Sequence, residues 1–411
     1  MAHYKRFLLK IILASLILML PVGVIYKGIR IQNKINNDSI SLLTATATKR
    51  SPIAVRLMNN SFLNSNNENS LNARCTERTR VVYIKIHKTG SSSFANILQR
   101  FGYNRKLMFA LPRKNKGDYR QNYIGEVENS VTKDNIINCG GHECNILYNH
   151  VVFNMTSFDS IFPKDSVYIS LIRDPLYQTI STFIYYDNSV VWKTTFSRLS
   201  EYLINPENVE PNNPHYSFTN NRQFLDLGLP GDKLRDTDFI DKYIQKLDEK
   251  FTLIMITEYF DESLVLLKRY LCWSLKDIIY FRKNSGQSSK ISGTLTVSDL
   301  ERLKQWQLAD SMLYKYFLEV FWNKFRREKF ILDEVSHFRQ ILRLTENFCG
   351  SDEIGSHLII AASAWNEEFT ITSLDCIFLR LDEISFQNKL HRDQNILIGT
   401  LKHNNTHNTH L

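Results

Sequence analysis

The chain has 411 residues, of which 43% are hydrophobic and 12% aromatic, and it carries a formal net charge of +9. This length suffices for one large catalytic domain or two smaller ones, with a substantial core. Only 15 glycines and 9 prolines occur, so the composition excludes collagen-like and wholly disordered chains.

The positive charge is concentrated near the start of the chain. Residues 1–26 carry three basic residues and no acidic one, and residues 27–76 carry seven basic residues against two acidic ones. Only one unit of the excess therefore falls on residues 77–411. Nucleic-acid binding requires a basic surface on a folded domain, so this distribution argues against nucleic acid as a partner.

Residues 7–26, FLLKIILASLILMLPVGVIY, form an apolar run interrupted only by Lys10. About twenty apolar residues span a bilayer, and a lysine side chain within such a helix can reach the membrane surface. A cleaved secretory signal is the competing interpretation, but no clear small-residue cleavage site follows the run. We expect an uncleaved transmembrane signal anchor behind a short cytoplasmic tail, residues 1–6, although the flanking charges specify its orientation only weakly.

Residues 27–76 contain ten Asn and six Ser and show no sustained helical or strand periodicity. Such a segment cannot bury enough apolar surface to offset its conformational entropy, so it predicts a disordered stem. Four Asn-x-Ser/Thr triplets, beginning at Asn37, Asn59, Asn154 and Asn404, are candidate glycosylation sites. The six cysteines are compatible with disulfides in an oxidising compartment, but their pairing does not follow from the sequence.

From residue 77 the pattern changes to alternating strands and helices. Apolar runs at 81–86, 166–172 and 251–256 predict buried strands. The predicted helices that follow them are 91–101 with Gly102 as its stop, a helix that begins near Pro175, and 261–272. This alternation predicts an α/β fold with a mostly parallel sheet, in which ligands bind at the carboxyl ends of the strands.

The remaining sequence divides at about residue 350. Residues 298–345 are predicted to be helical, because their apolar residues recur at helical spacing. Residues 351–411 contain eight acidic and four basic residues, and we assign no role to them. The single catalytic domain is therefore expected to span residues 77–350.

The segment 85–93, Lys-Ile-His-Lys-Thr-Gly-Ser-Ser-Ser, lies at a predicted strand-to-helix junction. Amides at a helix start and the helix dipole favour an anion, Gly90 permits close approach of the backbone, and Lys88 adds a full positive charge. The expected anion-binding residues are Lys88, Thr89, Gly90, Ser91, Ser92 and Ser93. The segment lacks the Gly-x-x-x-x-Gly-Lys-Ser/Thr pattern of ATP-hydrolysing proteins, and its serines could instead serve only as helix caps.

A second candidate anion site lies at 171–183, again where a predicted strand enters a helix. Arg173 can bind a phosphate with two parallel hydrogen bonds, and Ser181, two turns into the helix, can point toward the same anion. Taken alone, Arg173 and Asp174 would more simply form a surface ion pair. The presence of both segments at strand-to-helix junctions favours anion binding.

Together these segments resemble the 5'-phosphosulfate and 3'-phosphate binding elements of sulfotransferases that use 3'-phosphoadenosine-5'-phosphosulfate (PAPS). More specifically, the chain resembles the galactose-3-O-sulfotransferases, the Golgi group that includes galactosylceramide sulfotransferase. The matching stretches are 83–112, 149–154, 170–183, 221–228 and 258–284, with a weaker match at 306–322. The family commonly has two adjacent histidines where this chain has Asn149 and His150, and Phe-Asp-Leu-Gly where this chain begins with Leu225. These departures leave acceptor choice open.

The resemblance implies a P-loop-like sulfotransferase fold and transfer of a sulfuryl group from PAPS, with no metal required. It implies the 3-hydroxyl of a terminal β-galactose, on a glycolipid or a glycoprotein, as the acceptor. It also implies a single-pass type II protein anchored in the Golgi membrane, with a lumenal catalytic domain. A homodimer is a further expectation.

The resemblance also assigns roles to the two anion-binding segments. Lys88 and the neighbouring amides and hydroxyls would stabilise the departing 5'-phosphate, because they concentrate positive charge and hydrogen-bond donors there. Arg173 and Ser181 would bind the 3'-phosphate, which distinguishes PAPS from ATP-like nucleotides.

The acceptor hydroxyl has a high pKa and gains from a general base. His87 is the first candidate, because an imidazole can be neutral near pH 7, and the resemblance supports the same residue. His150 is the second candidate, either for acceptor binding or as the base, and Lys85 is expected to assist. A structural histidine at the end of a strand is the alternative for His87.

Three alternatives predict a different function or site. Asp236-Thr-Asp238 is typical of metal-dependent glycosyltransferases that use nucleotide sugars, although Asp236 also fits the N-cap of a predicted helix at 239–250. The segment from Cys139 to Cys144 resembles part of a zinc site but lacks a fourth ligand, which favours a disulfide or free thiols. The third alternative is a membrane-anchored protein that binds carbohydrate and has lost catalysis. The intact anion-binding residues argue against it.

Overall fold

The computed structural model of the chain describes residues 54–55, 75–113, 121–125, 129–137, 139, 143–186, 199–281, 295–351 and 356–407; for residues 54–55 and 400–407 it describes the backbone only. The predicted signal anchor at 7–26 and most of the predicted stem lie outside these residues. None of the helices in the described part is both long enough and apolar enough to cross a bilayer.

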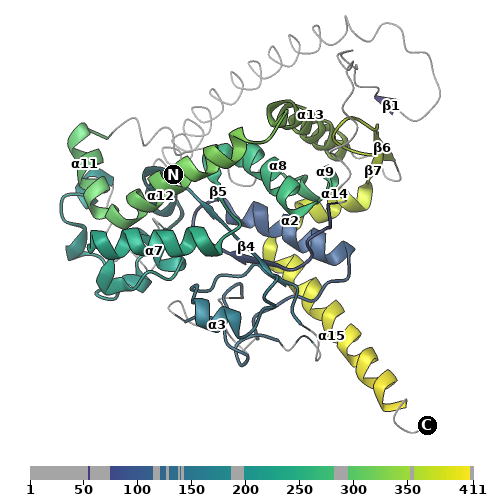
Figure 1. The fold of residues 1–411 in the computed structure, drawn as a ribbon, viewed down its shortest axis with the longest axis horizontal. Helices are drawn as coiled ribbons and strands as arrows, with labels where there is room; N and C mark the ends of the chain where they lie inside the picture. Colours follow the sequence, from purple (N-terminus) through teal and green to yellow (C-terminus); the bar gives the residue numbers. More distant parts are fainter. Residues whose placement is uncertain are drawn as a thin grey trace, which may run out of the picture. The chain divides into compact units, whose positions relative to one another are not determined.

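A four-stranded parallel sheet forms the centre of the fold (Figure 1). Its strands, in spatial order, are β3 (Ile146–Leu147), β2 (Val81–Ile84), β4 (Val167–Ile172) and β5 (Leu253–Ile256). Every residue of the four strands is buried, which explains why they are continuous apolar runs rather than alternating ones. The predicted α/β class with a parallel sheet and the three predicted strands are confirmed.

Helices follow the strands and flank the sheet. The longer ones in the first part of the chain are α2 (Ser91–Asn104), α4 (Pro175–Tyr186), α7 (Thr237–Lys250) and α8 (Phe260–Leu271). The shorter ones are α3 (Met155–Asp159), α5 (Leu199–Tyr202), α6 (Arg222–Asp226) and α9 (Leu275–Ile278). Single 3-10 turns lie at Pro206–Asn208, Pro214–Tyr216, Gly231–Lys233 and Thr257–Tyr259. Pro175 opens α4 as predicted, because its fixed φ suits the first helical turn.

The region predicted to be helical at 298–345 forms three helices. They are α11 (Val297–Trp306), α12 (Leu308–Arg326) and α13 (Ile331–Gly350). The helical conformation is interrupted at Gln307 and again before α13, where Phe330 adopts a left-handed φ of 57°.

The Asp236-Thr-Asp238 triplet lies at the start of α7. Asp236 is the N-cap residue, and its side chain accepts a hydrogen bond of 3.1 Å from the Phe239 amide. The interpretation of this residue as a helix cap is therefore confirmed.

The predicted helix stop at Gly102 is wrong. α2 continues to Asn104, and Gly102 lies inside it. A β-carbon at this position would lie 2.3 Å from Phe109 Cζ and 2.6 Å from Ile146 Cδ1. The glycine therefore permits close packing of α2 against its neighbours and does not end the helix.

Residues after 350 belong to the same compact unit as the sheet. β6 (His357–Ile360) pairs antiparallel with β7 (Phe369–Thr372) and parallel with β1 (Ala54–Val55), a two-residue strand within the predicted stem. α14 (Ser373–Arg380) and α15 (Glu383–His407) follow, and α15 begins beside α2 (Figure 1).

The described structure contains three disulfides, with sequence separations from 5 to 197 residues. They join Cys75 to Cys272, Cys139 to Cys144 and Cys349 to Cys376. The expectation of a disulfide or free thiols at Cys139 and Cys144, in place of a zinc site, is confirmed in its disulfide form.

Replacing Gly102 with Ala is expected to lower the free energy of unfolding by about 1–3 kcal/mol, because the added methyl group overlaps Phe109 and Ile146. Gly350→Ala is the matched control, since Gly350 ends α13 and a methyl group there would have no neighbour within 4 Å among the described residues. Urea unfolding followed by circular dichroism compares both variants with the parent chain. Equal stability of the two variants would contradict the close packing at Gly102.

Candidate active site

The turn between β2 and α2 has the geometry of an anion site. Lys88, with φ of 63°, and Gly90, with φ of 80°, adopt left-handed backbone conformations that bend the chain into the start of α2. Among the described residues, the amides of Ser91 and Ser92 have no hydrogen-bond acceptor, and no side chain caps the helix. Unsatisfied amides and the positive end of the helix dipole favour a negatively charged group here.

Thr257, which follows β5, fixes this turn to the sheet. Its hydroxyl lies 2.7 Å from Thr89 O and 2.9 Å from Ile172 O, so it bridges the ends of β2, β4 and β5. Thr89 in turn donates its hydroxyl proton to Ile86 O at 3.2 Å. The position of the anion site is therefore set by three neighbouring strand ends.

Arg173 follows β4 and lies against the same turn. Its Nη1 donates to Lys88 O at 3.2 Å, and its backbone amide donates to Gln223 Oε1 at 2.8 Å. Its Nε is buried and has no hydrogen-bond partner within the described structure, while Glu258 Oε1 lies 3.9 Å away. A half-buried guanidinium whose buried Nε is an unused donor suits an anionic ligand.

Lys88 supplies the second cation. Burial and the neighbouring charge of Arg173 lower the pKa of Lys88 to about 8. Its ammonium group lies 3.6 Å from the centre of the Tyr185 ring and forms no ion pair with any described residue. Lys88 thus has no ion-pair partner there, and Arg173 has only the long contact with Glu258. Two neighbouring cations of this kind favour an anion between or beside them, so these residues fit a phosphate or sulfate group.

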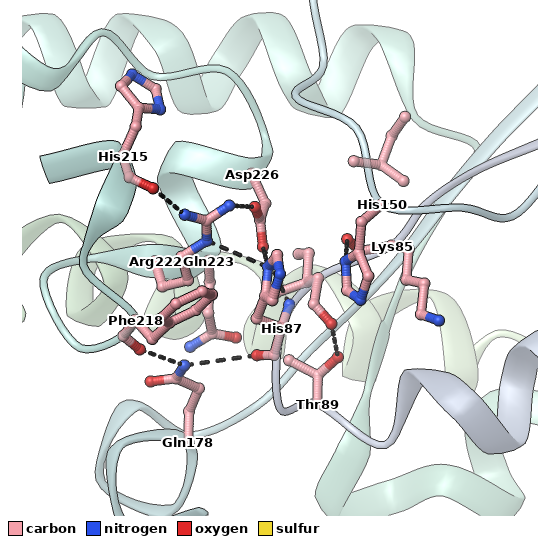
Figure 2. A network of polar contacts seen from close by, with 12 residues as sticks. Lys85, His87, Thr89, His150, Gln178, His215, Phe218, Arg222, Gln223 and Asp226 are labelled. Carbon is pink, nitrogen blue, oxygen red and sulfur yellow. Dashed lines mark hydrogen bonds and ion pairs between the residues drawn. The ribbon is translucent and has the colours of Figure 1, made fainter. Parts of the chain in front are cut away.

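His87 lies at the centre of a buried hydrogen-bond network (Figure 2). Its Nδ1 is 2.7 Å from Asp226 Oδ2, and its backbone amide donates to the same oxygen at 3.0 Å. Its Nε2 is 2.5 Å from the Tyr123 hydroxyl. Arg222 forms an ion pair with Asp226 and places its Nε 3.2 Å from His87 Nδ1.

The partners of His87 assign its ring proton. A carboxylate can only accept a hydrogen bond, so the contact with Asp226, shorter than the one with Arg222, places the proton on Nδ1. Nε2 is then the ring nitrogen that can accept a proton. The arrangement is that of a histidine oriented by a carboxylate, which is how a general base is held in many hydrolases and transferases.

The electrostatics keep His87 neutral. Burial is the main reason that the pKa of His87 falls to about 4, and the charges of Arg222 and Lys85 add to the effect while Asp226 opposes it. Burial raises the pKa of Asp226, but the charge of Arg222 and the hydrogen bonds from His87 and Arg222 lower it, and the net shift is downward. A charged carboxylate therefore faces a neutral imidazole near pH 7.

His150 stacks on His87. The ring centroids are 3.9 Å apart and the ring planes differ by 18°. His150 Nδ1 lies 3.1 Å from Lys85 O, and a carbonyl only accepts, so this contact assigns the proton to Nδ1. Burial and the charges of His87 and Lys85 lower the pKa of His150 well below its usual value. The two candidate bases are thus neighbours, but it is His87 that a carboxylate orients.

The structure brings His87, Lys88 and His150 together with Arg173. Ser181 is half-buried on α4 and makes no hydrogen bond to Arg173 or to the turn before α2 in the described structure. Its assignment to the 3'-phosphate, which helical spacing and the family resemblance favour, stays a prediction.

The remaining predicted residues occupy the turn and the start of α2. Thr89, Ser91 and Ser93 are buried, and Gly90 is exposed. Ser92 donates its hydroxyl proton to Glu383 Oε2 at 3.1 Å. This contact reaches a residue to which the sequence assigned no role.

Sequence reasoning missed the roles of Asp226 and Arg222. Both lie in the stretch 221–228 that carries the family resemblance, and their i, i+4 spacing predicts an ion pair on one helix face. No local pattern places them beside His87. Their helix, α6, is held by Asp310 of α12, whose carboxylate accepts hydrogen bonds of 2.8 and 3.2 Å from backbone amides of α6.

The chain is similar to known proteins over most of its length. A family model described as galactose-3-O-sulfotransferase matches residues 2–365. Galactosylceramide sulfotransferase of Homo sapiens is 32% identical over 304 residues, which cover 71% of this chain and 68% of that protein. Galactose-3-O-sulfotransferase 2 of Mus musculus is 31% identical over 283 residues, covering 67% and 70% of the two chains. The resemblance predicted from the sequence is confirmed.

The ammonium group of Lys88 is expected to titrate near pH 8, because burial and Arg173 disfavour its charge. Competitive labelling with acetic anhydride, read by peptide mass spectrometry across a pH series, measures this midpoint. Arg173→Met should raise the midpoint by removing a like charge, and added inorganic sulfate should raise it by supplying an opposite one. A midpoint at the ordinary lysine value of about 10.4 would contradict the described environment.

Proposed function

Because the chain belongs to the galactose-3-O-sulfotransferase family, we propose that it transfers the sulfuryl group of PAPS to the 3-hydroxyl of a terminal β-galactose on a glycolipid or glycoprotein. Membership of this family identifies the chain as a galactose sulfotransferase. What we propose beyond it is PAPS as the sulfuryl donor and the class of the acceptor. The observation that carries it is a neutral, carboxylate-oriented His87 next to a turn with two cations and unused amides.

The donor site is assigned to the two strand-to-helix junctions. PAPS would supply a sulfuryl group whose bond to the 5'-phosphate breaks as a bond from sulfur to the acceptor oxygen forms. Lys88 and the amides of Ser91 and Ser92 bind the 5'-phosphate and stabilise the charge left on it. Arg173, with its unused Nε, and Ser181 are assigned to the 3'-phosphate.

His87 is assigned as the general base. Its Nε2 accepts the proton of the acceptor hydroxyl, and Asp226 holds Nδ1 and stabilises the resulting imidazolium. The Tyr123 hydroxyl contacts Nε2 and marks a position from which an oxygen can donate to this nitrogen. His150, stacked on His87, limits rotation of the ring and is assigned to the acceptor side.

We further propose that residues 7–26 anchor the chain in the Golgi membrane as a single-pass type II protein with a lumenal catalytic domain. Three disulfides support this placement, because disulfides persist in oxidising compartments such as the secretory pathway. The apolar length of the segment supports a membrane span.

The full chain, purified in detergent, is expected to transfer radiolabelled sulfate from PAPS to galactosylceramide or to a galactose-terminated glycoprotein. Transfer should persist in a chelator, whereas a nucleotide-sugar-dependent glycosyltransferase would need a divalent metal. His87→Ala and Lys88→Ala should each lower kcat/KM by at least about a hundredfold, the range typical of a lost general base or charge stabiliser.

Asp236→Asn is the control for this assay, because asparagine preserves the cap of α7 and leaves the site untouched. It should retain the parent activity. Near-normal turnover in both His87→Ala and Lys88→Ala would contradict the assignment, and loss of activity in Asp236→Asn together with metal dependence would favour the glycosyltransferase alternative.

The pH dependence of kcat/KM, which reports the free enzyme, is expected to be bell-shaped with limbs near pH 4 and pH 8. Below the lower limb His87 carries a proton and cannot accept one, and above the upper limb Lys88 loses its charge. Lys88→Arg should move the upper limb to higher pH. An acid limb near pH 6.5, the ordinary histidine value, would contradict a buried His87 as the base.

A further inference from the structure

Helix α15 contributes a side chain to the site although it lies beyond the family match, which ends at residue 365. The helix begins beside α2 (Figure 1). Its first residue, Glu383, is buried. One carboxylate oxygen forms an ion pair with Lys85 Nζ, and the other accepts the Ser92 hydroxyl proton at 3.1 Å. A single carboxylate therefore joins the end of β2 to the start of α2.

Further contacts hold α15 in this position. Gln387, one turn after Glu383, accepts a hydrogen bond of 2.6 Å from Asn149. Gln394 forms two hydrogen bonds of 3.0 Å with the backbone of Phe109. All three α15 side chains are buried, and a disulfide ties the preceding helix, α14, to α13. These contacts therefore fix the position of Glu383 in the fold.

Glu383 is the counter-charge of Lys85. Its side chain is 1% exposed, and Glu383 is its one ion-pair partner within the described structure. Burial lowers the pKa of Lys85, and Glu383 opposes this shift. The charge of Lys85 in turn helps to lower the pKa values of His87 and His150. Glu383 can therefore influence the histidine pair through Lys85 without touching either ring.

We propose that Glu383 is a positioning residue of this site, whose carboxylate fixes the Lys85 ammonium and the Ser92 hydroxyl beside the turn that binds the donor. The inference rests on the proposed function. Two consequences follow from the contacts. Ser92 offers its amide and not its hydroxyl proton to the donor, and the catalytic unit extends past residue 350 to include the start of α15.

The test measures kcat, KM for PAPS and melting temperature for Glu383→Ala and Glu383→Gln, alone and combined with Lys85→Met. Asp393→Asn is the matched control, because it breaks a more exposed Lys389–Asp393 pair on the same helix. We expect Glu383→Ala to lower kcat/KM at least tenfold at a temperature where the variant remains folded, and Asp393→Asn to match the parent. Glu383→Gln, which keeps the shape but not the charge, should lie between the two.

The double variants separate positioning from a structural role. If Glu383 acts through Lys85, Glu383→Ala should cause little additional loss of kcat/KM in the Lys85→Met background. If Glu383→Ala fails to fold, the same comparison is made with Glu383→Gln, which is nearly isosteric.

Several outcomes would overturn the inference. The first is that both Glu383 variants keep the parent kcat/KM. The second is that the fold-losses of Glu383→Ala and Lys85→Met multiply in full in the double variant. The third is tighter binding of PAPS by Glu383→Ala, which would make the carboxylate a competitor of the donor. A parent chain that transfers no sulfate would overturn this inference and the proposed function together, whereas an active parent matched by both Glu383 variants would overturn this inference alone.

Discussion

The contact between Asp226 and His87 is the interaction on which the site depends. One carboxylate oxygen accepts hydrogen bonds from both the ring and the backbone amide of His87, and the other accepts from Arg222. The contact joins α6 to the end of β2 and fixes the tautomer of the imidazole. Because Arg222 is itself buried, loss of the carboxylate would leave an uncompensated charge, which typically costs about 3–5 kcal/mol.

The cations of the site fall into two groups. Lys85 and Arg222 each pair with a buried carboxylate, so they are compensated and held in one geometry. Lys88 has no ion-pair partner within the described structure, and the ion pair of Arg173 there is a long contact of 3.9 Å from its Nε to Glu258 Oε1. Paired charges give a fixed framework, whereas uncompensated ones favour an anionic ligand, because the ligand offsets the cost of their burial. This division separates the cations that hold the site together from those that favour an anionic ligand.

Local signals underlie the site predictions made from the sequence. The turn before α2 was recognised from the order of lysine, glycine and serine at a strand-to-helix junction, and Arg173 from a second junction of the same kind. Gly102 was misjudged because a glycine near a helix end resembles a stop, and the closeness of Phe109 is visible only in three dimensions. The assignment of Ser181 rests on helical spacing and on the family resemblance, and it stays a prediction.

The sequence by itself determined the α/β class, three of the four strands of the parallel sheet and the candidate residues of the turn before α2, because apolar periodicity and helix-start signals are local. Only the tertiary structure decided which acidic side chains contact His87 and Lys85. Asp226 lies 139 positions from His87, and Glu383 lies 298 positions from Lys85. The packing of α6 and α15 against the sheet and α2 makes these pairs, and no local pattern encodes contacts across such distances.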